Sequence, residues 1–178
     1  MRWGLVACAM MLCSGPAGAD ERSSAIVAAF EEACVSELPN FAHLDAKAKA
    51  ENLPINIDVG TPRTPDGFFN HRKAWMVNLA SGSHELSAME ARGPAGEVSS
   101  CAVTVPDALG EEVKQDLVRT LNLGPAEREE VSPDGQRRSS GWSVKLQGEK
   151  LLLLLIDASP SKSPGAYLFI SHRLVAGS

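Results

Sequence analysis

The sequence predicts an α+β domain, an antiparallel sheet of about six strands with N-terminal helices and one central helix. Two observations lead to this class. In residues 23–38 and 107–123, apolar side chains recur at every fourth position, as on one side of an amphipathic helix. The second observation is a series of short segments rich in Val, Leu and Trp, separated by turns that contain Gly and Pro, which is typical of antiparallel strands. Helices packed on a sheet bury both kinds of apolar surface.

The first helix is expected over residues 23–38, where Ile26, Phe30 and Cys34 share the apolar side. Either serine at the start of this stretch can cap the N-terminus, and Pro39 helps to end the helix. Cys34 is therefore expected to point toward the rest of the domain.

A second helix is expected over residues 40–52. Phe41, Leu44 and Ala48 can face inward there, and the Ala- and Lys-rich sequence has high helix propensity. The next segment, residues 57–70, contains two prolines and a Pro-Asp-Gly turn signal. We expect an irregular surface loop there that covers the domain as a flap.

Three strands are expected next, over residues 73–79, 84–91 and 100–105, with a hairpin loop at 92–97. In the third of these strands, Cys101 shares one face with two valines, because side chains alternate along a strand. Cys101 is therefore also expected to point inward.

The central helix is expected to begin near Asp107 and to end before Gly124. The charged segment that follows, residues 126–141, is expected to be a solvated connector. We expect the last three strands at the positions where apolar residues return, over residues 142–146, 150–158 and 166–175.

The penultimate strand contains five consecutive leucines and an isoleucine between Lys150 and Asp157. Six residues of strand span about 20 Å, whereas a transmembrane strand needs about 9–11 residues and a transmembrane helix about 20. A strand that is apolar on both faces is expected inside a sheet that is covered on both sides. The predicted helices supply one cover. The second cover stays open between the long loop, the first helix and a partner.

Two strands share the pattern Trp-x-Val-x-Leu, which begins at Trp75 and again at Trp142. Each predicted copy follows a helix and precedes two further strands. Two interpretations are open. The domain is a duplicated αβββ unit with an added N-terminal helix, or a common strand pattern occurs twice by chance.

Residues 1–19 have the pattern of a cleaved signal peptide, with a basic start, a short apolar run and small residues at the end. Ala17 and Ala19 fit the two small-residue pockets of signal peptidase, so cleavage is expected before Asp20. An uncleaved, buried N-terminal helix is the alternative. After cleavage, residues 20–178 are expected to form a single α+β domain in the periplasm or outside the cell.

Four cysteines are present, of which Cys8 and Cys13 would leave with the signal peptide. The residues that end at Cys8 also resemble a lipidation box, which gives a lipoprotein as a second alternative. Cys34 and Cys101 would remain, and two cysteines in an exported chain usually pair. We therefore predict a disulfide that joins the first helix to the sheet.

Charge and motifs exclude several classes of protein. The 22 acidic residues outnumber the 17 basic ones, for a net charge of −5, and a nucleic-acid-binding protein usually carries a basic face. The chain contains none of the usual sequence motifs of hydrolases, metalloproteases, nucleotide-binding proteins or calcium-binding proteins. Ser159 and Lys162 match the SxxK motif of penicillin-binding enzymes, but prolines place them in an exposed loop. We expect no cofactor, no metal and no catalytic residue.

Basic residues enter both Trp strands: Arg72 and Lys73 precede the first, and Arg137 and Arg138 precede the second. If the two strands are equivalent, these pairs lie at similar strand ends and could converge into an anion-binding site. The alternative is ordinary solvated surface charge.

The "FEEAC" segment, the central Trp strand and the "SCAV" segment together resemble small exported proteobacterial proteins of uncharacterised function. The resemblance covers about residues 28–105 and leaves out the leucine-rich C-terminal third. It implies an exported α+β domain with paired cysteines, and it implies no activity.

These observations predict a small exported protein that binds another envelope or secreted protein, as a binding module or an inhibitor. The prediction rests on loops and an apolar strand in a chain without a recognisable catalytic set. A structural component of the envelope and an enzyme of unrecognised type are the alternatives.

Overall fold

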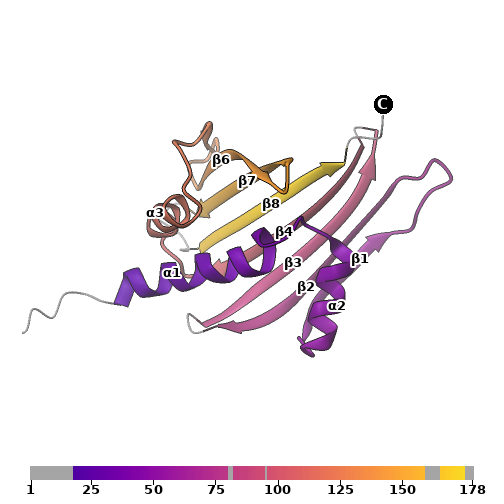
Figure 1. Ribbon diagram of the computed structural model, residues 1–178, viewed down its shortest axis with the longest axis horizontal. Coiled ribbons are helices and arrows are strands. Elements are labelled where there is room, and N and C mark those ends of the chain that lie inside the picture. The colour runs from indigo at the N-terminus through magenta and orange to yellow at the C-terminus, as the bar shows by residue number, and fades with distance from the viewer. Residues whose placement is uncertain (1–17, 80–81, 95, 159–164, 175–178) are drawn as a thin grey trace, which may run out of the picture.

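The computed structural model describes residues 18–79, 82–94, 96–158 and 165–174. Its centre is one antiparallel sheet of eight strands in the order β1-β2-β3-β4-β8-β7-β6-β5. Three α-helices and a π-helical turn lie on one face of this sheet (Figure 1). The predicted α+β class is confirmed, with eight strands in place of about six.

The helical elements are α1 (Gly18–Phe30), the π-helical turn η1 (Glu31–Val35), α2 (Phe41–Ala50) and α3 (Gly110–Thr120). The strands are β1 (Ile55–Thr61), β2 (Phe69–Leu79), β3 (Gly82–Gly93), β4 (Gly96–Pro106), β5 (Arg128–Val131), β6 (Arg137–Leu146), β7 (Glu149–Ala158) and β8 (Gly165–Leu174).

The two strands that the sequence did not predict form the two edges of the sheet. Strand β1 occupies the first part of the predicted loop at 57–70, and β5 lies inside the predicted connector at 126–141. Nearly all of their residues are exposed. An edge strand exposed on both faces needs no alternation of apolar and polar residues, so its main signal is backbone pairing with a neighbour. The predictions of a loop and a connector were wrong at these residues for that reason.

Helix α1 runs across the front of the sheet in Figure 1 and contacts α3. It begins at Gly18, so Ser23 and Ser24 lie inside the helix and do not cap it. Both serine hydroxyls donate hydrogen bonds to the carboxylate of Asp116 in α3, with a distance of 3.0 Å from Ser24. The predicted serine cap was therefore wrong, and these serines instead join two helices.

Helix α2 follows the prediction closely. The side chain of Asn40 caps it by accepting a hydrogen bond from the backbone N–H of His43 at 3.0 Å. Phe41, Leu44 and Ala48 are all buried against the sheet, as predicted from their spacing.

The two halves of the sheet repeat one arrangement: α2 precedes β1–β4, and α3 precedes β5–β8. Trp75 pairs with Leu86 of β3, and Trp142 pairs with Leu153 of β7. Adding 67 to the number of a residue in β2, β3 or β4 gives the equivalent residue in β6, β7 or β8, and paired residues stay paired. Each unit thus contains four strands, one more than the proposed αβββ unit, and the two Trp strands are equivalent.

The leucine-rich strand β7 lies inside the sheet, as predicted, but only one of its faces is covered by a described element. Leu151, Leu153 and Leu155 point toward the helices and are at most 2% exposed. Leu152 on the other face is 41% exposed. The long loop and the first helix, the two covers expected from within the chain, lie elsewhere: α1 is on the same face as α3 (Figure 1). None of the described helices is long and apolar enough to cross a membrane.

Candidate functional site

The predicted disulfide between Cys34 and Cys101 is present and joins η1 to β4. The two Cα atoms are 5.4 Å apart, and both cysteines are at most 2% exposed. The bond therefore lies in the layer between helices and sheet, where the apolar spacing of both segments placed it. This burial makes the bond part of the core.

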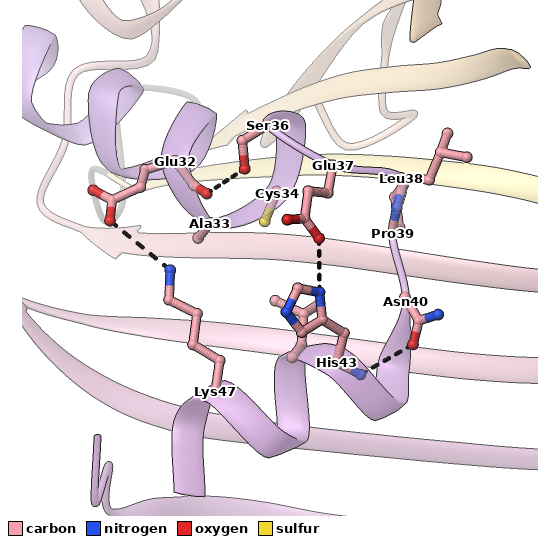
Figure 2. Close-up of a pocket in the computed structure, with 11 residues that line it drawn as sticks. Glu32, Ala33, Cys34, Ser36, Glu37, Leu38, Pro39, Asn40, His43 and Lys47 are labelled. Carbon is pink, nitrogen blue, oxygen red and sulfur yellow. Dashed lines mark hydrogen bonds and ion pairs between the residues drawn. The ribbon is translucent and has the colours of Figure 1, made fainter. Parts of the chain in front are cut away.

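A cleft of 190 Å³ lies beside the disulfide, between η1 and α2 (Figure 2). Its two walls are joined by a contact between His43 Nδ1 and the Glu37 carboxylate at 2.7 Å and by an ion pair from Glu32 to Lys47 at 3.8 Å. Beyond Lys47, the cleft adjoins an apolar hollow of 110 Å³ over the sheet. That hollow is smaller than the cavity of about 150 Å³ that holds one benzene in a protein core. We therefore interpret the smaller hollow as a packing gap under α2, which these contacts hold in place.

The first predicted basic pair is divided between the two faces of the sheet. Arg72 lies on the uncovered face and donates to Glu85 at 3.0 Å. Lys73 points to the helices and contacts Asp45 at 2.9 Å and Asp58 at 3.3 Å. The hydrogen bond to Asp45 is the largest cause that raises the pKa of the Lys73 ammonium. This lysine thus anchors α2 and β1 to β2.

The second pair is divided in the same way. Arg137 is exposed on the uncovered face, whereas Arg138 contacts Asp157 at 2.9 Å and Glu111 at 4.0 Å on the helix side. Strands β2 and β6 have four strands between them, and their first residues lie at opposite ends of the sheet. The structure therefore does not bring Arg72, Lys73, Arg137 and Arg138 together into one anion site.

The uncovered face carries a group of large apolar side chains on β7 and β8. We call this group the apolar patch, and its members are Leu152, Leu154, Ile156, Tyr167 and Phe169. Apart from the more exposed Leu152, these side chains are half-buried by their neighbours. The rings of the two aromatic residues stack, with centroids 6.0 Å apart. Burial raises the pKa of the tyrosine hydroxyl.

The internal repeat provides a comparison for the apolar patch within the same molecule. Glu85, Ser87, Met89, Ser100 and Ala102 occupy the equivalent places in the first unit. One of these five side chains is a large apolar group. The equivalent strands pair in the same register with small and polar residues, so strand pairing alone does not require large apolar side chains at these positions.

Three basic residues border one end of the apolar patch, and we call them the cationic row. Lys145 of β6 pairs with Lys150 of β7, and Arg173 of β8 occupies the next position of the same register. A shallow hollow of 390 Å³ includes Lys150 and Arg173 in its lining. A second hollow, of 450 Å³ and lined in part by Arg137, lies at the opposite end of the apolar patch. This surface therefore combines apolar contact area with positive charge at both ends.

No cluster of three His, Cys, Asp or Glu side chains able to hold a metal ion occurs in the part of the chain that the structure describes. Ser159 and Lys162 of the SxxK match lie outside the described residues.

Comparisons of this chain with protein-family models, with curated proteins and with solved structures found no match in any of the three. The geometry of the uncovered face is therefore the basis for a functional proposal.

Sequence reasoning identified the leucine run but did not identify the surface to which it contributes. The signal that could have located it is the alternation along β7, which places Leu152, Leu154 and Ile156 on one face. The aromatic residues of β8 alternate in the same manner. What the sequence could not provide is the sheet order that makes these two strands neighbours.

Proposed function

We propose that this protein is an exported binding protein, and that it holds another protein on the apolar patch. The observation that carries the proposal is the difference between the two units, because large apolar residues replace small and polar ones on one half of a repeated surface. Because strand pairing in this register does not need such residues, we assign them a role in binding.

The shape of the surface favours a protein over a small molecule. Small-molecule sites are concave and enclose most of their ligand. The apolar patch is instead spread over two adjacent strands with shallow hollows at its ends. Contiguous apolar residues that are partly exposed and bordered by charge are typical of protein-binding surfaces. The expected partner is another envelope or secreted protein.

Export is part of this proposal and has its own test. The disulfide needs an oxidising compartment to persist, and residues 1–19 have the pattern of a signal peptide. The intact mass of the protein recovered outside the cytoplasm should correspond to a chain that begins at Asp20. A mass that includes residues 1–19, or a lipid on Cys8, would contradict this part of the proposal.

Binding is tested by a photoreactive amino acid placed at Leu152, or at Val59 as a control, in the cell of origin. Val59 is 59% exposed and lies on the same face of the sheet, on edge strand β1 of the first unit. We expect the Leu152 probe to form an adduct with a second protein that the Val59 probe does not form. The proposal fails if the Leu152 probe gives no protein adduct, or if both probes give the same adducts.

A substitution separates lost binding from lost folding. Leu152→Glu introduces the residue type that the first unit has at the equivalent position, Glu85, so we expect the melting temperature to change little. Copurification of the cross-linked partner should be lost in Leu152→Glu and retained in Val59→Glu. Retention of the partner by both variants would contradict the proposal.

A further inference from the structure

We propose that the partner presents an amphipathic α-helix that lies along β7 and β8, with acidic side chains at the end that meets the cationic row. This inference rests on the proposed function, because it specifies which kind of protein surface the apolar patch accepts.

The dimensions of the apolar patch suit one helix. Its residues lie on two adjacent strands, which gives a width of roughly 10 Å, and an α-helix with side chains is about 10–12 Å across. Along β7, the patch extends from Leu152 to Ile156, a distance of about 13 Å. Two to three turns of helix cover that length.

The covered side of the same strands shows how a helix packs on them. Helix α3 contacts β7 and β8 and buries Val113 and Leu117 against the leucines of that face. The residues of β7 on the two faces have nearly the same composition: three leucines toward α3, and two leucines and an isoleucine toward solvent. A second amphipathic helix would therefore find an equivalent apolar surface.

The position of the apolar patch argues against an added strand. Peptides that bind as strands pair with an exposed sheet edge. The edges of this sheet are β1 and β5, whereas the apolar patch lies on the face of two interior strands. Side chains, not backbone groups, meet a ligand there.

The positive charge of the cationic row indicates which side chains the partner's helix should carry. The cationic row places Lys145, Lys150 and Arg173 side by side at one end of the apolar patch. Glu127, which accepts a hydrogen bond from Ser143 at 2.8 Å beside this row, offsets part of the positive charge. Acidic side chains on the partner would complement the charge of Lys145 and Lys150 and favour one orientation of the helix.

The same charges disfavour a second copy of this chain as the occupant. In a two-fold dimer built face to face, the cationic row would meet either its own copy or the opposite end of the sheet. The opposite end carries Arg137, so both arrangements bring positive charges together.

The experiment uses photoreactive probes at Leu152 and, in a second variant, at Ile156 of the full chain, with the cross-linked peptides sequenced by mass spectrometry. If the partner segment is helical, the two cross-linked positions should lie about nine residues apart, because about 13 Å along a strand equals that many steps of 1.5 Å. An extended segment would place them about four residues apart. We also expect Asp or Glu within one turn of the residue cross-linked from Leu152.

Charge reversal tests the role of the cationic row. Lys150→Glu should lower the yield of the Leu152 adduct about tenfold, and about 0.5 M salt should lower the wild-type yield in the same direction. The matched control is Arg92→Glu, which makes the same change of charge at an exposed residue on the helix-covered face.

The outcomes separate this inference from the proposed function. A protein adduct with the four-residue spacing, without acidic neighbours, or with equal effects of Lys150→Glu and Arg92→Glu overturns the inference and leaves the proposed function standing. A cross-link only to a second copy of this chain overturns both, because the proposed partner is a different protein. Adducts with lipid only, or no adduct, overturn both.

Discussion

Removal of the Cys34–Cys101 disulfide should destabilise the protein strongly. The bond closes a loop with a sequence separation of 67 residues. For a loop of that length, the constraint on the unfolded chain contributes about 4 kcal/mol at 25 °C. A typical domain has a free energy of unfolding of about 5–15 kcal/mol, so this one bond supplies a large share. For a domain of this size, the melting temperature should fall by about 8–16 °C.

The assay compares wild type and the double variant Cys34→Ala, Cys101→Ala, each with and without a reductant. The reductant should lower the melting temperature of wild type and leave that of the double variant unchanged. This comparison separates reduction of the bond from other effects of the reductant. A shift below about 2 °C would refute the loop-entropy argument. Two free thiols in the native protein would refute the pairing itself.

The structure also predicts where the reduced protein opens first. Helix α1 keeps its own contacts after reduction, because it buries Ile26 and Phe30 and bonds to Asp116 of α3. The turn η1 has the disulfide as its covalent link to β4. Amide hydrogens of η1 should therefore exchange faster on reduction, before those of α1. Equal acceleration in both elements would contradict this order.

Three further predictions concern single side chains. Trp142→Phe should cost about 1–3 kcal/mol of stability in urea unfolding, because the indole N–H donates to the carbonyl oxygen of Gly124 at 3.0 Å; an unchanged midpoint would contradict this. Gly110→Ala should cost about 1–3 kcal/mol, because its Cβ would lie 2.1 Å from the side chain of Asp157. Gly124→Ala, with no atom within 4 Å of the added carbon, is its control. Burial, and secondarily the nearby Arg22 charge, lowers the pKa of His84 in the folded protein. As the pH falls, the unfolded chain therefore binds a proton at this histidine before the folded chain does. The melting temperature should thus be constant above pH ~6.5 and fall below it. His84→Leu, which introduces the residue type of the second unit at the equivalent position, should weaken that fall, and an identical pH profile would exclude His84 as its source.

The parts of the fold that the sequence predicted are those where burial is one-sided and periodic. The spacing of Phe41, Leu44 and Ala48 located α2 because one side of that helix is buried. The disulfide was predictable for the same reason, since both cysteines belong to buried stripes. Strands β1 and β5 were not predictable in this way, because pairing with a neighbour, and not burial, holds an edge strand in place.

The basic residues show a second limit of sequence reasoning. Arg72 and Lys73 are adjacent in the chain, and side chains on a strand alternate, so they lie on opposite faces and bind different carboxylates. The hypothesis of one anion site treated each adjacent pair as a unit. The distance between the two basic pairs follows from the sheet topology, because four strands separate β2 from β6 and these two strands run in opposite directions.

The repeat makes it possible to separate what the fold requires from what a binding surface requires. Toward the helices, Trp75 is matched by Trp142 and Leu86 by Leu153, although His84 corresponds to Leu151 and Lys73 to Ser140. On the uncovered face, the five large apolar side chains of β7 and β8 have small or polar counterparts at four positions of β3 and β4, with Met89 as the exception. A core imposes the same demand on both units because both pack helices on the same side of the sheet. A single external partner would contact one unit only, and the large apolar side chains of the apolar patch all belong to one unit.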